Sequence, residues 1–405
     1  MRGRNLWLSL LCSASAALAA GPRLTNPRRV FPTGGVTYKR PTQRHVWAMR
    51  LSPAGTHVLY SRPQGEPPVR ADGTADWHKA KYELVLRELS SGKDTVLPLG
   101  PIESGWQTGL LRFGVFDPAG TRLAPIRIEV QREQVGEGVE AVRSATKVLL
   151  YDIATGKVTP TGLEGPMVMA RFDRTGKGLI VMKATGQGWG LFTAALPKLE
   201  LQPRKAVGFP NAVCPGADVV CMWAPPQRKR PTEPGRRPER TGQRLFLCDL
   251  AADREIADLP VHERNSVLDD LECQWTPDGR YLCYYDVREE PAEAGSRRRP
   301  KLRVMTRIWD RRGGREARRV PDAIPLGPGP GPSSIMLVKR QASGDGPFLL
   351  HDAKNGSEWP LGDATVRPIH AHGRKVVYAK VADDGTEAVY VADVVGAEAK
   401  APKTP

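Results

Sequence analysis

Short apolar segments alternate with turn residues along most of this chain. In each copy of the pattern an apolar run leads to a turn that contains Pro or Gly, and a second apolar run follows, at 52–61, 117–126, 173–182, 214–223, 276–285 and 371–380. A third apolar run comes later in the copy and ends near an Asp-containing turn, as at 82–93, 147–157, 244–254, 347–357 and 388–398. Alternate residues such as Val376 and Tyr378 fall on one face, which indicates β-strands.

Repetition of short β segments at this period is typical of a β-propeller, in which each copy forms one blade. We therefore predict an all-β fold with seven blades, near 45–100, 110–163, 167–203, 212–262, 271–322, 323–362 and 369–398. Six or eight blades are the alternatives, because the copy after Pro321 is the least regular. Its alternating Gly and Pro residues at 327–332 leave little room for an inner strand.

The last copy ends near Val395 without a convincing fourth strand. A ring that lacked this strand would leave an exposed sheet edge, which proteins generally cover. The segment 29–39 contains Val30, Phe31, Val36 and Tyr38 and could supply the missing strand. We expect the N-terminal segment to pair with the C-terminal blade and close the propeller.

The first residues have the features of a secretory signal peptide. Arg2 and Arg4 precede an apolar stretch at 6–16, and Ala17 and Ala19 form a small-x-small cleavage site. We therefore predict a signal peptide at 1–19, an N-terminal segment with the closing strand at 20–44, the propeller at 45–398 and a disordered tail at 399–405. A lipid anchor at Cys12 is the alternative. No later stretch has the roughly 18 apolar residues of a membrane helix, so we expect a periplasmic or secreted protein.

One copy of the repeat carries a more specific motif. Trp275, Thr276, Pro277, Asp278 and Gly279 stand in the order of the Trp-Ser-Pro-Asp-Gly signature, and the chain thereby resembles the TolB-type, or WD40-like (PD40), β-propeller repeat family. Other copies are degenerate, because Ala54 and Ala119 replace the aspartate. The resemblance implies a scaffold that holds ligands at the mouth of its channel, as found in binding proteins, in appendages of peptidases and in some lyases.

Turn aspartates and cysteines have mainly structural interpretations. We expect the aspartates at the turn after the third strand to bond backbone groups, namely Asp152, Asp249, Asp310, Asp352 and Asp393. Without Cys12 five cysteines remain. Cys273 could pair with Cys283, and Cys221 with Cys248, or all could be small buried residues. No CxxC spacing is present, so the sequence offers no zinc site.

The formal net charge is +16, and its arginines are clustered. Segments at 63–81, 129–146, 224–243 and 287–300 lengthen the connection between the second and third strands and are rich in Pro, Gly and charge. We label the four strands of a blade A to D in chain order. The loops between strands B and C then share one face of the ring with the loops that join strand D to strand A of the next blade, so we predict a binding face there. Its candidate residues are Arg228, Lys229, Arg230, Arg236, Arg237, Arg297, Arg298, Arg299, Asp269 and Asp270. Solvated loops without a partner are the alternative.

Familiar catalytic signatures such as GxSxG, HExxH and the phosphate-binding loop are absent from the sequence. We therefore interpret the chain as a secreted, non-catalytic scaffold that binds a protein or an anionic envelope component through its long B–C loops, without cofactor or metal. Nucleic acid is disfavoured, because no aromatic residues are interleaved with the arginines. The alternative is a propeller-fold lyase or hydrolase acting on an acidic polysaccharide, whose candidate groups are His262, Asp269, Asp270, Glu272, His370 and His372. A position of His262 or His370 near the central funnel would distinguish the two.

Overall fold

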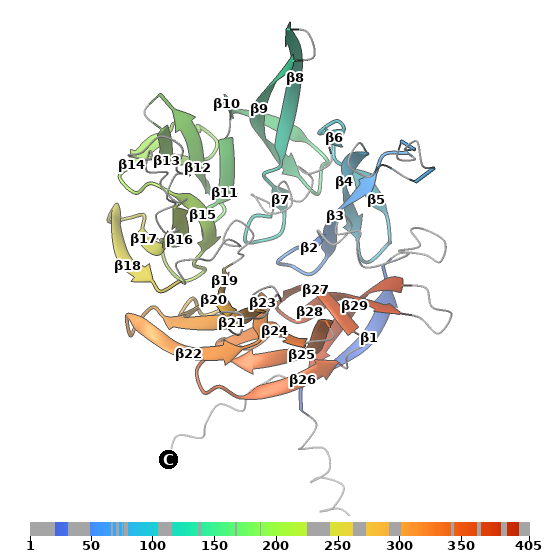
Figure 1. The fold of residues 1–405 in the computed structure, drawn as a ribbon, viewed down its shortest axis with the longest axis vertical. Coiled ribbons are helices and arrows are strands. Elements are labelled where there is room, and N and C mark those ends of the chain that lie inside the picture. The colour runs from blue at the N-terminus through green and yellow to red at the C-terminus, as the bar shows by residue number, and fades with distance from the viewer. Residues whose placement is uncertain are drawn as a thin grey trace, which may run out of the picture.

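A computed structural model describes most of the chain. The described residues are 21–30, 49–65, 68–69, 73–74, 76, 80–103, 116–136, 139–166, 168–186, 188–224, 244–261, 273–290, 301–341, 344–362, 366–381 and 387–396. They form strands and turns, which are grouped in seven antiparallel sheets around one axis (Figure 1). The predicted seven-bladed, all-β propeller is therefore confirmed. Within these ranges no helix has the length and apolar character needed to cross a membrane.

Blades 1 to 4 follow one another along the chain. Blade 1 contains β2 (Met49–Leu51), β3 (His57–Pro63), β4 (Lys81–Glu88) and β5 (Asp94–Val96), with β6 (Ile102–Glu103) also beside β4. Blade 2 contains β7 (Arg122–Leu123), β8 (Ile126–Gly136), β9 (Val139–Asp152) and β10 (Val158–Gly165). Blade 3 contains β11 (Val168–Phe172), β12 (Gly178–Thr185), β13 (Gly188–Ala195) and β14 (Gln202–Arg204). Blade 4 contains β15 (Phe209–Val213), β16 (Val219–Ala224), β17 (Arg244–Asp249) and β18 (Arg254–Leu259).

Blades 5 to 7 complete the ring. Blade 5 contains β19 (Gln274–Trp275), β20 (Tyr281–Glu290), β21 (Lys301–Asp310) and β22 (Arg315–Pro321). Blade 6 contains β23 (Ala323–Pro328), β24 (Ser334–Gln341), β25 (Gly344–Asp352) and β26 (Glu358–Gly362). Blade 7 contains β27 (Val366–His372), β28 (Lys375–Val381), β29 (Glu387–Val395) and the N-terminal strand β1 (Arg23–Arg29).

The inner strand of blade 6 forms in spite of its Gly and Pro residues. β23 pairs with β24 and shifts register between Pro325 and Gly327. Proline is tolerated there because an inner strand is a sheet edge. Glycine is needed at 327, since an added Cβ would lie 1.9 Å from the Ala371 carbonyl oxygen of blade 7. The expectation that this segment has little room for a strand was therefore wrong, because its small residues permit close approach to the next blade.

The N-terminal strand closes the ring, as predicted, although it lies upstream of the expected position. β1 pairs with β29 from Arg23 opposite Val395 to Arg29 opposite Tyr390. Figure 1 shows this strand at the outer edge of blade 7. The Val30 amide donates to the Val389 carbonyl (2.8 Å), while residues 31–39 of the expected segment lie outside the described part. β1 tolerates its internal proline because it is an edge strand with a register shift between Thr25 and Arg28.

Apolar side chains fill the spaces between neighbouring blades. One cluster joins Val58 and Val85 of blade 1 to Val377 and Val391 of blade 7, across the point where the ring closes. Further clusters lie between blades 4 and 5, 5 and 6, and 6 and 7. Each sheet hides both faces against its neighbours, so the ring is one packed unit.

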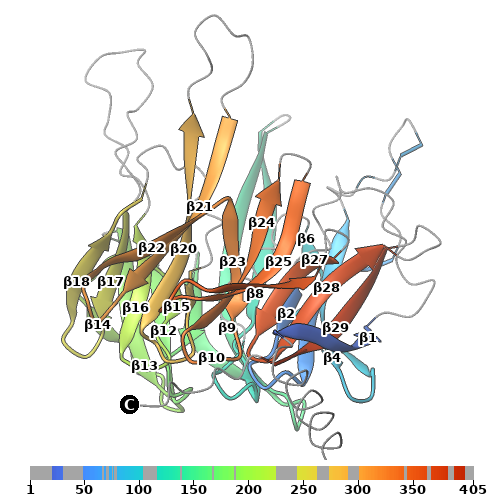
Figure 2. The same ribbon diagram turned by 90° about the horizontal axis from the view of Figure 1, so that it is seen from below.

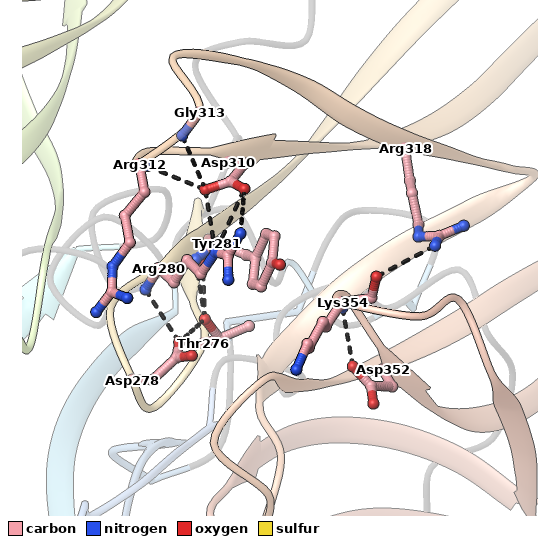
Figure 3. Close-up of polar contacts among 10 residues, drawn as sticks. All are labelled: Thr276, Asp278, Arg280, Tyr281, Asp310, Arg312, Gly313, Arg318, Asp352 and Lys354. Carbon is pink, nitrogen blue, oxygen red and sulfur yellow. Dashed lines mark hydrogen bonds and ion pairs between the residues drawn. The ribbon is translucent and has the colours of Figure 1, made fainter. Parts of the chain in front are cut away.

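Most of the predicted turn aspartates bond backbone amides. Asp310 Oδ1 accepts from the amides of Arg312 (3.0 Å) and Gly313 (3.2 Å), and Asp310 Oδ2 also accepts from Arg280 Nη2 (2.8 Å), as Figure 3 shows. The same backbone role is seen for Asp152, Asp249 and Asp352. Asp393 instead forms an ion pair with Lys375 Nζ at 2.7 Å.

The long B–C hairpins project to one side of the ring. Figure 2 shows β8–β9, β20–β21 and β24–β25 directed toward the same face. We call this the hairpin face, and the opposite one, which carries the turns between the first and second strands of each blade, the turn face.

Candidate functional site

A cavity of about 610 Å³ lies at the axis of the propeller. All seven blades contribute to it. Six do so through their inner strands or the turns that follow them, and blade 2 does so through Phe116, which bridges to Leu123, and Pro118. We call this cavity the central funnel. Because its lining includes these turns, the described part of the funnel lies toward the turn face, and so away from the hairpin face.

His370 of blade 7 contacts the backbone of blade 1 inside the funnel. It is 8% exposed, and its Nδ1 accepts a hydrogen bond from the Leu51 amide (3.3 Å). Burial, with Arg50 and His372 nearby, lowers the pKa of His370 well below its usual value. The imidazole is therefore neutral, and since Nδ1 is the acceptor, the proton is on Nε2.

Arg50 Nη1 lies 3.3 Å from that Nε2. In this tautomer both atoms are donors, because a guanidinium nitrogen cannot accept a hydrogen bond and Nε2 carries its proton. The contact thus places two N–H groups side by side, one of them on a cation. An oxygen of an anionic group is the kind of acceptor that suits such a pair.

Arg171 of β11 adds a second cation to the funnel wall. Its Nε donates to the Pro210 carbonyl of blade 4 (2.8 Å). Burial lowers the pKa of Arg171 to about 10, so the guanidinium stays charged at neutral pH. The wall also carries the aromatic rings of Phe116, Phe172 and Trp275.

The carboxylates near the turn face are occupied by local structure. Asp173 Oδ1 accepts from the Thr175 amide (2.9 Å) and hydroxyl (2.8 Å). Asp117 is 2% exposed, and its Oδ1 accepts from the Thr121 amide (2.7 Å). Arg174, at the rim, pairs with Asp218 (2.6 Å). The charged side chains among the described lining residues are thus Arg50, Arg171, Arg174 and Asp173, three cations and one carboxylate.

His372 also lines the funnel, two residues after His370. Burial lowers the pKa of His372 to about 4, so this ring is neutral at pH 7. Within the described ranges no group of three or more His, Cys, Asp and Glu side chains is placed to hold a metal ion.

The sequence-predicted binding residues fall outside the described part of the chain. This applies to Arg228, Lys229, Arg230, Arg236, Arg237, Arg297, Arg298, Arg299, Asp269 and Asp270, and to the alternative candidates His262 and Glu272. Of the residues considered for catalysis, the structure brings His370 and His372 together in the funnel.

Sequence reasoning missed Arg50 and Arg171. A signal was present in the repeats. The turn between the first and second strands begins at Ser52, Asp173 and Thr276 in three of the copies, and Arg50, Arg171 and Gln274 each stand two residues before it. These three side chains line the funnel. Polar residues at this position of an otherwise apolar strand therefore mark the channel, and alignment of the repeats with one another would have shown them.

The two cysteine pairs considered from the sequence do not form, and the alternative interpretation, small buried residues, is what the structure shows. Cys221 lies opposite Leu247 and Cys248 lies opposite Val220, so the two cysteines are one residue out of register and point to opposite faces. The same holds for Cys283, which lies opposite Gln274 rather than Cys273. Instead, the Cys221 thiol contacts the Cys273 sulfur at 3.5 Å. All five described cysteines are free and buried.

Comparison with solved structures found similar chains at low sequence identity. The β-propeller domain of the trilobed protease from Pyrococcus furiosus is 12% identical, with a TM-score of 0.46 over 93% of this chain and 94% of that chain. TolB from Acinetobacter baumannii is 12% identical, with a TM-score of 0.34 over 84% and 82%. An acylaminoacyl peptidase from Pyrococcus horikoshii is 10% identical, with a TM-score of 0.46 over 83% of this chain and 49% of that chain.

No protein-family model and no curated protein sequence matches this chain. The seven-bladed propeller is therefore established by the sheet topology of this chain, and the comparisons assign no activity to it.

Proposed function

We propose that this protein is a non-catalytic binding propeller that holds an anionic group of a protein or envelope component in its central funnel. The observation that carries the proposal is the pairing of Arg50 Nη1 with His370 Nε2 at 3.3 Å, two donors on a funnel wall that also carries Arg171. A carboxylate or phosphate oxygen placed between such donors forms charge-assisted hydrogen bonds. The aromatic rings beside them supply apolar contact for the rest of a ligand.

The funnel is prepared for this role before a ligand arrives. The Leu51 amide fixes the tautomer of His370 through Nδ1, and the Pro210 carbonyl orients Arg171 through Nε. Groups that are already oriented lose less conformational entropy on binding. His370 and Arg171 are each oriented by a hydrogen bond from a neighbouring blade, so ligand recognition depends on the assembled ring.

A lyase or hydrolase acting on an acidic polysaccharide is the second candidate, because His370 lies in the funnel. Proton transfer at neutral pH needs a group whose pKa lies near 7. The pKa of His372 is about 4, and His370 Nδ1 is engaged by the Leu51 amide. These two histidines are therefore better suited to donate hydrogen bonds or pack than to abstract a proton.

We propose that the protein binds this partner outside the cytoplasm. This part rests on the basic residues, apolar stretch and small-residue site of 1–19. N-terminal sequencing of the protein recovered from a periplasmic or culture fraction tests it. A mature chain that begins near residue 20 is expected, and recovery of intact Met1 in the cytoplasmic fraction would contradict export.

A titration experiment tests the funnel itself. Calorimetric binding of a polygalacturonate oligomer and of an acidic peptide is compared for wild type, Arg50→Gln, Arg171→Gln and the control Arg315→Gln, on the exposed outer strand β22. Loss of one charge-assisted contact should weaken the affinity of the better probe by about tenfold or more, and added salt should weaken the wild-type complex. Absence of saturable binding by both probes, or equal affinities of Arg50→Gln and Arg315→Gln, would contradict the proposal.

A further inference from the structure

We infer that Cys221 and Cys273 are a site of covalent modification, at which an external disulfide oxidises the two thiols to a cross-link between blades 4 and 5. Their sulfur atoms are 3.5 Å apart, and a disulfide needs about 2.0 Å. Among the described cysteines these two are in sulfur–sulfur contact. The inference does not depend on the proposed function of the funnel.

The two thiols differ in access. Cys273 lies directly before β19, is 3% exposed and contributes to the funnel lining, so the cavity is the side from which an oxidant would meet it. Cys221 lies within β16 and is 0% exposed. This difference assigns Cys273 as the thiol that meets the oxidant and Cys221 as the thiol that resolves the intermediate.

The surroundings hold both residues in place. The Cys273 amide donates to Asn211 Oδ1 (2.8 Å), which links the start of β19 to β15. Both cysteines belong to the apolar cluster between blades 4 and 5. The charge of Arg171 acts favourably on a thiolate at Cys221, although burial raises the pKa of that thiol well above its usual value. A nearby guanidinium is a feature of reactive cysteine sites.

The reaction balances as ordinary thiol–disulfide exchange. The Cys273 thiolate attacks one sulfur of the external disulfide, which breaks the external S–S bond and releases one thiol. The Cys221 thiolate then attacks the Cys273 sulfur, forms the Cys221–Cys273 bond and releases the second thiol. Two electrons pass from the cysteines to the external disulfide, and the two protons end on the released thiols.

The other described cysteines serve as internal comparisons. Cys214 Sγ donates to the Gly279 carbonyl (3.3 Å), and Cys248 faces away from Cys221 in the sheet. Both are 0% exposed. If burial alone decided oxidation, Cys214 and Cys248 would react as Cys221 does. If the Cys221–Cys273 contact decides it, Cys214 and Cys248 stay reduced.

The test uses the purified full chain, glutathione disulfide as the oxidant, alkylation and peptide mass mapping. Wild type should yield one cross-linked peptide pair containing Cys221 and Cys273, lighter by two hydrogen atoms and lost on reduction. Cys248→Ser should retain this species. Cys221→Ser should lack it and instead carry glutathione on Cys273, and Cys273→Ser should lack both products.

Full alkylation of Cys221 and Cys273 in oxidised wild type, or a cross-link to Cys283 instead, would overturn the inference. A second measurement covers variants that fail to fold. The thermal midpoint of oxidised wild type should exceed that of the reduced protein, because a cross-link restricts the unfolded chain. Equal midpoints for a confirmed cross-link would show that native geometry is strained and would overturn the assignment of a preformed site.

Discussion

Removal of the N-terminal strand should open the ring at its seam. A chain that begins at Phe31 lacks both β1 and Val30, whereas a control that begins at Gly21 keeps them. Val30 is 7% exposed and belongs to the cluster that joins blades 1 and 7. Its carbonyl also accepts from Arg87 Nη1 of blade 1. The strand therefore connects the last blade to the first through its end as well as through its pairing with β29.

The expected loss of stability can be estimated from Val30 alone. Burial of a valine side chain contributes about 2 kcal/mol, and the hydrogen bond from its amide to Val389 contributes about 1 kcal/mol. The truncation should therefore lower the free energy of unfolding by at least about 3 kcal/mol, before the pairing of β1 is counted. The exposed edge of β29 should also promote association between chains.

Urea unfolding followed by far-ultraviolet circular dichroism measures this change. With a denaturant slope of about 3 kcal/mol per molar, the unfolding midpoint should fall by about 1 M relative to the control. Size-exclusion chromatography at several protein concentrations reports the association. Identical midpoints for the chains that begin at Gly21 and Phe31 would refute the idea that β1 closes the ring.

Three shorter predictions concern other parts of the molecule. Gly327→Ala should destabilise the protein by about 2 kcal/mol or more in urea unfolding, because the new Cβ would meet the Ala371 carbonyl, while the control Gly186→Ala, with open space at its Cβ, should not. Acid should reduce stability, because the pKa of folded His372 is about 4 against 6.5 for the ordinary group. Its contribution is complete above pH 6.5 and is lost as the pH falls to 4, by about 3 kcal/mol, and His372→Gln should flatten this part of the stability profile. Charge reversal at Arg297, Arg298 and Arg299 should weaken binding of the anionic probe and reduce its salt dependence if the hairpin face contributes, and an unchanged affinity and salt slope would exclude those arginines.

The fold could be predicted because the sequence of most blades contains the same short-range pattern. Two apolar strands around a Pro or Gly turn, followed by an aspartate turn, appear in most copies. Asp310 illustrates why this pattern can be recognised in the sequence, since the two backbone amides that donate to its carboxylate lie within three residues of it. The position of β1 was less predictable. Its pairing partner Val395 is far away in sequence, and Arg23–Arg29 has little of the alternation of a typical strand.

The funnel was not predictable in the same way, because its contacts join distant copies. Arg50 and His370 are separated by 320 residues and meet between blades 1 and 7. Arg171 reaches Pro210 in the next blade. Their side chains point to the axis according to the register of each inner strand, and β27 shifts register just before His370. A sequence pattern indicates which residues alternate, whereas these local shifts decide which of them face the channel.

Opening of the ring should therefore also weaken ligand binding in the funnel. The Leu51 amide orients His370 across the same seam that Val30 and Arg87 help to close. If the seam opens, Nδ1 loses its donor and the Nε2 proton loses its fixed direction, although the sheets of blades 2 to 6 remain intact. The chain that begins at Phe31 should then bind the anionic probe at least about tenfold more weakly at a temperature where its circular dichroism still matches that of the control. Retention of full affinity by a folded truncated chain would mean that the Arg50–His370 pair forms without the closing strand, and the dependence of recognition on the closed ring would be wrong.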